Sequence, residues 1–143
     1  MDERVREHAA VLVDWSARID AGDDVVVAAS EGSHDLAVAV CEALGERGAN
    51  YVAVYDSDEV KRAYRRAHDG DFDQDPAFEL ALYEQADAVL RLGRGRNTAA
   101  QADVSGETRQ AHRRARTGIR EARMDTDWVS TVHPTRSLAQ QAG

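Results

Sequence analysis

The stretch that decides the fold is Val25-Val26-Val27-Ala28-Ala29-Ser30, a run of six uncharged residues that begins with three valines. Uncharged, β-branched runs of this length are typical of strands buried on both faces of a parallel sheet. A Gly-Asp turn precedes the run, and a helical pattern follows it from Ser33 to a C-cap expected at Gly48. The run therefore predicts the first strand of a β-α-β unit.

Strand and helix patterns alternate on both sides of this run. Apolar residues at spacings of three and four predict an opening helix between Val5 and Ser16. Strand starts roughly 26 to 41 residues apart, with helices between them, predict parallel pairing. We expect an α/β three-layer sandwich with a mostly parallel sheet of at least four strands, helices on both faces and, by analogy of fold, a flavodoxin-like strand order. The further elements expected are strands at 51–56, 87–93 and 128–134, a helix to His68 capped by Asp56 with Glu59, a helix capped by Asp75 with Pro76 in its first turn, a helix at 105–123, and a helix beginning after 134.

The 143 residues fit one domain, and no apolar stretch is long enough to span a membrane. The N-terminus, MDERVREH, is charged and has no apolar segment of the kind that a secretory signal needs. The single cysteine, Cys41, lies within a helical pattern, where a small buried thiol is expected. These features predict a cytoplasmic protein that does not bind membranes.

The charge balance is strongly acidic, with 26 acidic residues against 18 lysines and arginines. Of the acids 16 are aspartate, whereas Lys61 is the only lysine. An acidic surface poor in lysine is typical of proteins that stay soluble in molar salt, which favours a halophilic source. A GC-rich genome would favour the same residues without such selection.

Metal-binding patterns are weak throughout the chain. None of the five histidines has another at i+3 or i+4, and no HExxH-type pattern is present. Asp69, Asp71 and Asp73 alternate as in a calcium loop, but Gln74 and Leu80 stand where that loop needs Gly and Glu. We expect a solvated acidic loop and no metal or catalytic residue.

Phosphate-binding signals are also weak. The segment after the first strand, SEGSHD, lacks GxGxxG, and GRGRNT (93–98) has threonine where the third glycine belongs. An alternative hypothesis nevertheless remains, a stand-alone α/β module that binds a small anionic ligand or nucleotide at the carboxyl ends of the strands. A third is a pure interaction domain. The residues of the ligand hypothesis are Ser30, Asp56, Gly93–Asn97 and His133.

An arginine stripe marks the helix expected at 105–123. Its members recur at spacings of three and four and are Arg109, Arg113, Arg116, Arg120 and Arg123. No aromatic residue interleaves with them for base stacking, so we expect no nucleic-acid partner. The stripe is either a solvated face or a surface that pairs with acids of another domain.

Several short motifs occur along the chain, and the last combines an aromatic strand, a Pro-Thr turn and an Ala-Gln-x-Ala-Gly helix start in an order that is hard to obtain by chance. They are Leu12-Val13-Asp14-Trp15, the turn from Gly22 into Val25–Val27, Arg47-Gly48-Ala49, Ala86-Asp87-Ala88 with Asn97 beyond it, and the most specific piece, Trp128–Thr135 followed by Leu138–Gly143. Together they resemble the N-terminal part of the thermophilic metallo-aminopeptidase family (aminopeptidase T and related leucyl aminopeptidases).

The resemblance implies that 1–143 is the N-terminal α/β domain of a longer two-domain chain. It implies a homodimeric exopeptidase that releases N-terminal amino acids from peptides with two divalent metal ions. Such metals polarise the scissile carbonyl and activate a water. The family's metal ligands lie in its C-terminal domain, so this portion alone is expected to be inactive and to bind none. The arginine stripe then supplies candidates for an interdomain or access-lining surface: Arg113, Arg116, Arg120 and, beyond the stripe, His133.

Overall fold

Strand β1 (Asp24–Ser30) lies in the middle of a parallel sheet, between β2 (Asn50–Asp56) and β3 (Ala88–Leu92). Strand β4 (Asp127–Thr131) pairs in parallel with the other side of β3, which gives the order β2-β1-β3-β4. The computed structural model describes residues 2–93 and 104–131. The α/β class and the parallel sheet are confirmed, and the order follows the flavodoxin-like pattern.

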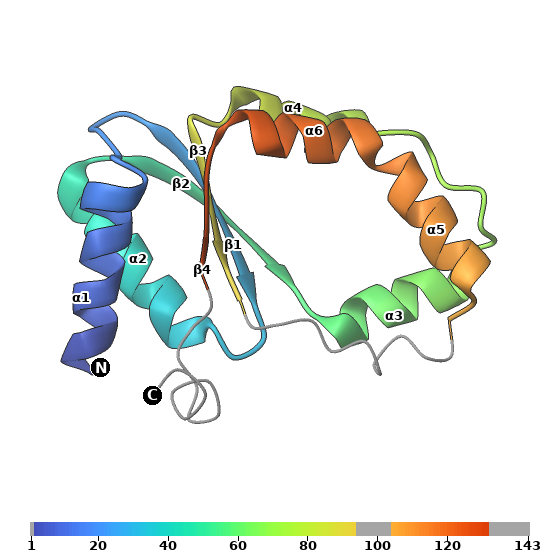
Figure 1. Cartoon of the computed structure of the whole chain (residues 1–143), viewed down its shortest axis with the longest axis horizontal. Helices are drawn as coiled ribbons and strands as arrows, with labels where there is room; N and C mark the ends of the chain where they lie inside the picture. Colours follow the sequence, from blue (N-terminus) through green and yellow to red (C-terminus); the bar gives the residue numbers. More distant parts are fainter. Residues whose placement is uncertain (1, 94–103, 132–143) are drawn as a thin grey trace.

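Helices cover the two faces of the sheet unequally (Figure 1). On one face lie α1 (Glu3–Val11), the π-helical turn η1 (Leu12–Ser16) and α2 (His34–Arg47). On the other lie α4 (Ala77–Gln85) and α6 (Thr117–Asp125). Helices α3 (Asp58–Ala67) and α5 (Gly106–Ala115) pack on each other beyond the carboxyl end of β2, away from the sheet. No helix within 2–93 or 104–131 is long and apolar enough to cross a bilayer.

Alternation along β1 sends its valines into two separate cores. Val25 and Val27 pack with η1, α2 and β3 residues in the larger core, and Val26 packs with Tyr83, Val89 and Ile119 in the smaller one. All three valines are at most 2% exposed. Successive side chains of a strand point to opposite faces, so a run of buried valines requires a covering layer on each side.

Polar side chains at the amino ends of the strands fix their register. The Asp24 N–H donates to Asp87 Oδ2 at 2.8 Å, and the Asp87 N–H donates to the Asp24 carbonyl at 2.7 Å. The Asn50 side-chain amide donates to Asp24 Oδ1 at 2.9 Å. One carboxylate-amide network therefore joins β1, β2 and β3 where they begin.

Strand β2 lies at one edge of the sheet that the described residues form, and it lacks the cover that the central strands have. Six of its seven residues are exposed and only Val54 is half-buried. Tyr51 is 58% exposed, Val52 47% and Tyr55 62%. Because its apolar side chains meet solvent on both faces, β2 differs from the doubly covered strand usual in parallel sheets.

Two predicted helix starts are wrong by one residue, and each has a local cause. The N-cap of α3 is Ser57, whose hydroxyl accepts from the Val60 N–H at 3.1 Å, rather than Asp56. Pro76 occupies the N-cap position of α4 in place of Asp75, whose φ of 44° turns its carboxylate elsewhere. The segment from 132 onward, with His133 and the helix expected after 134, lies outside the described residues.

Truncation of a central side chain tests the two-core arrangement. Leu90 is fully buried in the larger core, so Leu90→Ala is expected to lower the free energy of unfolding by about 2–5 kcal/mol. Val60→Ala, at a site 55% exposed on α3, is the control and should change it by less than about 0.5 kcal/mol. Urea unfolding measures both, and equal effects would contradict the assigned core.

Candidate functional site

The predicted single helix at 105–123 is wrong, because the chain breaks at Arg116 into α5 and α6. Arg116 has φ −111° and ψ 18°, outside helical geometry. The carboxylate of Asp75, distant in sequence, accepts from the Ile119 N–H at 3.1 Å and from the Gly118 N–H. A continuous helix would use those amides internally, so the capping of α6 by Asp75 requires the break.

Two further hydrogen bonds hold Asp75 in this position. Its own N–H donates to the Ala115 carbonyl at 2.6 Å, and the Gln74 side-chain amide donates to its Oδ2 at 3.0 Å. The Gln74 bond, followed by the bonds from Ile119 and Gly118, lowers the pKa of Asp75. Gly118 leaves room for the carboxylate, because a Cβ there would lie 2.6 Å from Asp75 Oδ2.

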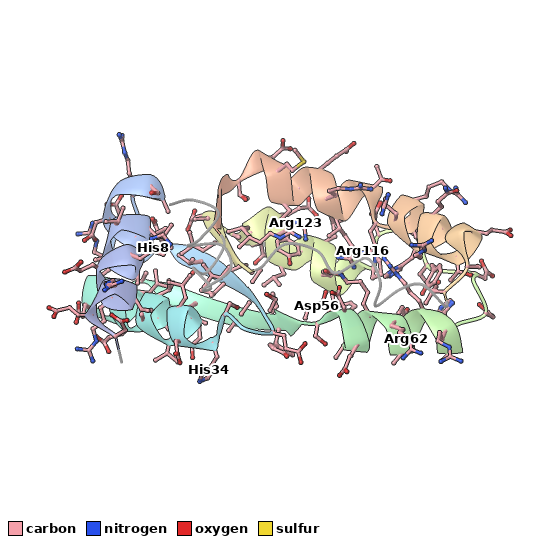
Figure 2. The ribbon with its side chains drawn as sticks, turned by 60° about the horizontal axis from the view of Figure 1, so that its bottom comes forward. His8, His34, Asp56, Arg62, Arg116 and Arg123 are labelled. Atoms are coloured by element: carbon pink, nitrogen blue, oxygen red, sulfur yellow. The ribbon has the colours of Figure 1, made fainter. Side chains whose placement is uncertain are left out.

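Arg116 pairs within the domain. Its guanidinium makes two parallel bonds to the Glu79 carboxylate on α4, one of them 2.7 Å from Nη2 to Oε2. Both side chains are partly buried, and the bond to Glu79 raises the pKa of Arg116. Bidentate pairs of this kind fix orientation as well as charge. Arg116 therefore ties the α5–α6 junction to α4, and Figure 2 shows its side chain on the inner side of the structure.

The other arginines of the predicted stripe have different surroundings, because the break turns α6 away from the line of α5. Arg113 is exposed on α5, and its carbonyl accepts from Arg120 Nη2 at 3.0 Å. Arg123 lies with Cζ 5.7 Å from the centre of the Tyr83 ring. The Nε atoms of Arg109 and Arg123 are buried and have no hydrogen-bond partner among the described residues. The five side chains do not form one continuous stripe.

A cluster of four rings joins α3, the following loop and α5. His68 stacks on Phe72 with centroids 4.0 Å apart, and Phe72 lies 4.6 Å from the His112 ring. Tyr64 lies within 6.0 Å of the other three. The Arg65 side chain is buried, and its Nε–H donates to His112 Nδ1 at 3.1 Å.

This environment keeps His112 neutral. Burial, with the positive charges of Arg65, Arg116 and Lys61 and the neighbouring His68, lowers the pKa of His112 to about 4. The bond from Arg65 has the same consequence, because a protonated Nδ1 could not accept it. His112 is thus an acceptor that anchors α3 to α5 at neutral pH.

The carboxyl end of the sheet brings Ser30 and Gly93 together, as the ligand hypothesis expects of neighbouring strands. The hydroxyl of Ser30 donates to the Leu92 carbonyl at 3.4 Å. A Cβ on Gly93 would lie 2.9 Å from that hydroxyl, so the close approach needs glycine. Asp56 accepts from the Ser57 N–H and pairs with Lys61 at 3.2 Å. The rest of this predicted site, 94–97 and His133, lies outside the described residues.

An open groove of about 670 Å³ lies between α4 and α6. Its polar lining is mostly acidic, from Glu84, Asp87, Glu121 and Asp125. Over 2–93 and 104–131, no three His, Cys, Asp or Glu side chains are grouped so that they could hold a metal ion. Burial raises the pKa of the Cys41 thiol, which disfavours the reactive thiolate.

A family profile matches this chain over almost its whole length. The profile of the thermophilic metalloprotease (M29) family matches residues 1–142. The chain belongs to the M29 metalloprotease family. The resemblance of its motifs to the thermophilic metallo-aminopeptidases is thereby confirmed.

One solved structure shares the fold of this chain. Wild-type AmpT from Thermus thermophilus superposes with a TM-score of 0.75 at 18% identity, over 93% of this chain. The match covers 36% of AmpT, so this M29 chain spans about a third of that protein. The CurK enoyl reductase gives a TM-score of 0.39 at 13% identity over 96% of this chain and 44% of its own, too low to establish a common fold. No curated protein matches the sequence.

Sequence reasoning missed the residues that organise this half of the M29 domain. Asp75 was expected to cap its own helix, and no role was predicted for Glu79, Arg65 or His112. A usable signal was present in Thr117-Gly118, a residue pair that weakens a helix in mid-pattern. The two residues of each pair (Glu79 with Arg116, Asp75 with Ile119, Arg65 with His112) lie about 37 to 47 positions apart in the sequence. A pattern of neighbouring residues therefore does not reveal them.

Gly118→Ala tests the Asp75 cap through the sign of its effect. Gly→Ala within a helix normally raises the free energy of unfolding by up to about 1 kcal/mol. Here the new methyl group would contact the Asp75 carboxylate, so the free energy of unfolding is expected to fall by about 1–3 kcal/mol. In an Asp75→Gly background, whose φ of 44° suits glycine, Gly118→Ala should become neutral or stabilising. Thermal unfolding of the four proteins checks this, and the same sign in both backgrounds would contradict it.

The His112 environment predicts a pH dependence of stability. The unfolded chain protonates this histidine near pH 6.5 and the folded chain only near pH 4. The unfolded state therefore holds more protons in this interval, and the free energy of unfolding should fall as pH falls from about 6.5 towards 4. His112→Gln, which can still accept from Arg65, should flatten the slope between about pH 5 and 6.5.

Urea unfolding across that interval measures the slope. His34→Gln, at a site remote from the ring cluster, controls for the loss of an imidazole as such. An unchanged slope in His112→Gln would show that His112 is not the responsible group.

Proposed function

We propose that this chain is the N-terminal, non-catalytic domain of an M29 metal-dependent aminopeptidase, a hydrolase that releases N-terminal amino acids from peptides. The observation that carries the proposal is the family match over 1–142 in a chain that corresponds to 36% of AmpT. The remaining two-thirds of such a protein would supply the catalytic domain and bind the peptide. The whole protein is proposed to be a cytoplasmic homodimer, from a halophilic source.

The donor set of the described residues does not fit a metal centre. Asp75 caps α6 and Glu79 pairs with Arg116, and the carboxylates that line the α4–α6 groove have no histidine or cysteine beside them. In the proposal the two divalent ions are therefore held by the C-terminal domain, and no catalytic step passes through these residues.

The contribution proposed for this domain is an interdomain surface on α5. Arg113 is exposed there, whereas Arg116 is paired with Glu79 and Arg120 donates to a backbone carbonyl. Ten of the 18 lysines and arginines lie between Asp58 and Arg123 on α3, α5, their junction and α6, although the chain as a whole carries a net charge of −8. Such a local excess of positive charge suits an acidic face of the neighbouring domain.

The length and activity of the native protein test the proposal. Protein isolated from its source is expected to have roughly two to three times the 15.7 kDa of this chain. It should release amino acids from unblocked peptides, lose this activity with a chelator and regain it with divalent metal. A native mass near 15.7 kDa, or activity that survives chelation, would contradict the proposal and favour the ligand-binding module.

Charge reversal at Arg113 tests the interdomain surface separately. Arg113→Glu in the native-length protein should weaken domain association and raise the protease sensitivity of the domain linker several-fold. Arg4→Glu makes the same charge change at an exposed residue on α1, outside this positive surface, and is the matched control. Equal behaviour of the two variants would leave Arg113 with no interdomain role.

A further inference from the structure

Strand β2 has an outer edge with no partner strand in 2–93 and 104–131. Natural sheets protect such edges with lysine, proline, bulges or a covering element. β2 contains neither lysine nor proline, and Tyr51, Val52 and Tyr55 are each about half exposed or more. An edge with free backbone groups and apolar side chains on both faces is suited to pair with another strand.

The sequence of β2 is palindromic. Asn50-Tyr-Val-Ala-Val-Tyr-Asp56 reads the same in both directions from Tyr51 to Tyr55, and Asn50 and Asp56 have side chains of nearly the same shape. Two antiparallel copies related by a two-fold axis place residue i opposite residue j and j opposite i. A palindrome is therefore the sequence that complements itself.

We propose that β2 is a homodimer interface, in which two β2 strands pair antiparallel about a two-fold axis at Ala53 and join the two sheets. Tyr51 of each copy then faces Tyr55 of the other, and Val52 faces Val54. Cross-strand aromatic and β-branched pairs of this kind stabilise antiparallel sheets. Asn50 faces Asp56, so the one charged side chain of the strand does not face a second carboxylate.

The register of β2 against β1 supports a two-fold axis at Ala53. Tyr51, Ala53 and Tyr55 align with Val25, Val27 and Ala29 of β1, so they lie on the face of the larger core, and Val52 and Val54 lie on the other. Pairing about Ala53 keeps tyrosine opposite tyrosine on one face and valine opposite valine on the other. Centring on Val52 or Val54 would instead place tyrosine opposite alanine and valine opposite a polar residue.

The pairing does not depend on the proposed peptidase function. A strand pair built on backbone hydrogen bonds and apolar side chains should also persist in molar salt, where the Debye length is about 3 Å and ion-pair interfaces weaken. Salt resistance thus separates it from an interface formed by the arginines of α5.

Short-range cross-linking tests the interface in the native-length protein. In a background without other reactive cysteines, Ala53→Cys should be joined to its counterpart by a short bismaleimide, because opposed residues of antiparallel strands lie about 4.5–5.5 Å apart at Cα. Adding Tyr55→Lys should lower the yield at least about tenfold, since it sets a charge against each Tyr51. The yield should be retained in 2 M salt.

Met124, an apolar residue on α6 that is 59% exposed, supplies the controls. Met124→Cys should give little cross-linked product, and Met124→Lys added to Ala53→Cys should leave its yield unchanged. Equal yields at positions 53 and 124, or no effect of Tyr55→Lys, would overturn the proposal. A third result would also overturn it: the protein is a monomer, and the cysteine of Ala53→Cys does not react with a monofunctional maleimide. That result would mean that another segment of the chain covers β2. Any of these results leaves the peptidase proposal standing.

Discussion

The burial of β1 on both faces is the constraint on which the rest of the structure depends. Val25 and Val27 face one way and Val26 the other, so the chain must supply a covering layer on each side. Helices α1 and α2 provide one layer and α4 with α6 the other. With β1 placed between β2 and β3, the carboxyl ends of three strands meet at one edge and β2 is left outermost.

The second layer exists because of contacts made far from the sheet. Asp75 caps α6 from a loop about 40 residues earlier, and Arg116 ties the junction of α5 and α6 to Glu79 on α4. The ring cluster around His112 then fixes α3 against α5. In the half of the domain formed by α3 to α6 the apolar core is small, and charged and polar contacts supply more of the stability. The stability of this half is therefore expected to respond to pH and to single polar substitutions.

Several carboxylates of the described residues have structural roles. The fold shared with AmpT accounts for about a third of that protein, and the carboxylates found here cap helices, fix strand register and pair with arginine. What this domain presents outward is a positive surface around α3 and α5 and an apolar edge at β2. Each is proposed above as a contact surface, α5 for the neighbouring domain and β2 for a second copy of the chain.

The sequence by itself determined the β-strands, the layer class and the family. Runs such as Val25–Ser30 and Tyr51–Asp56 carry their signal within a few residues, and their strand assignments are confirmed. Gly48 ends α2 in the left-handed conformation expected of a C-cap, with φ 78°. Only the tertiary structure broke the helix at Arg116 and gave Arg116 an internal partner. These outcomes depend on Asp75 and Glu79, which lie next to α6 and Arg116 only after folding, and local periodicity holds no information about such distant partners.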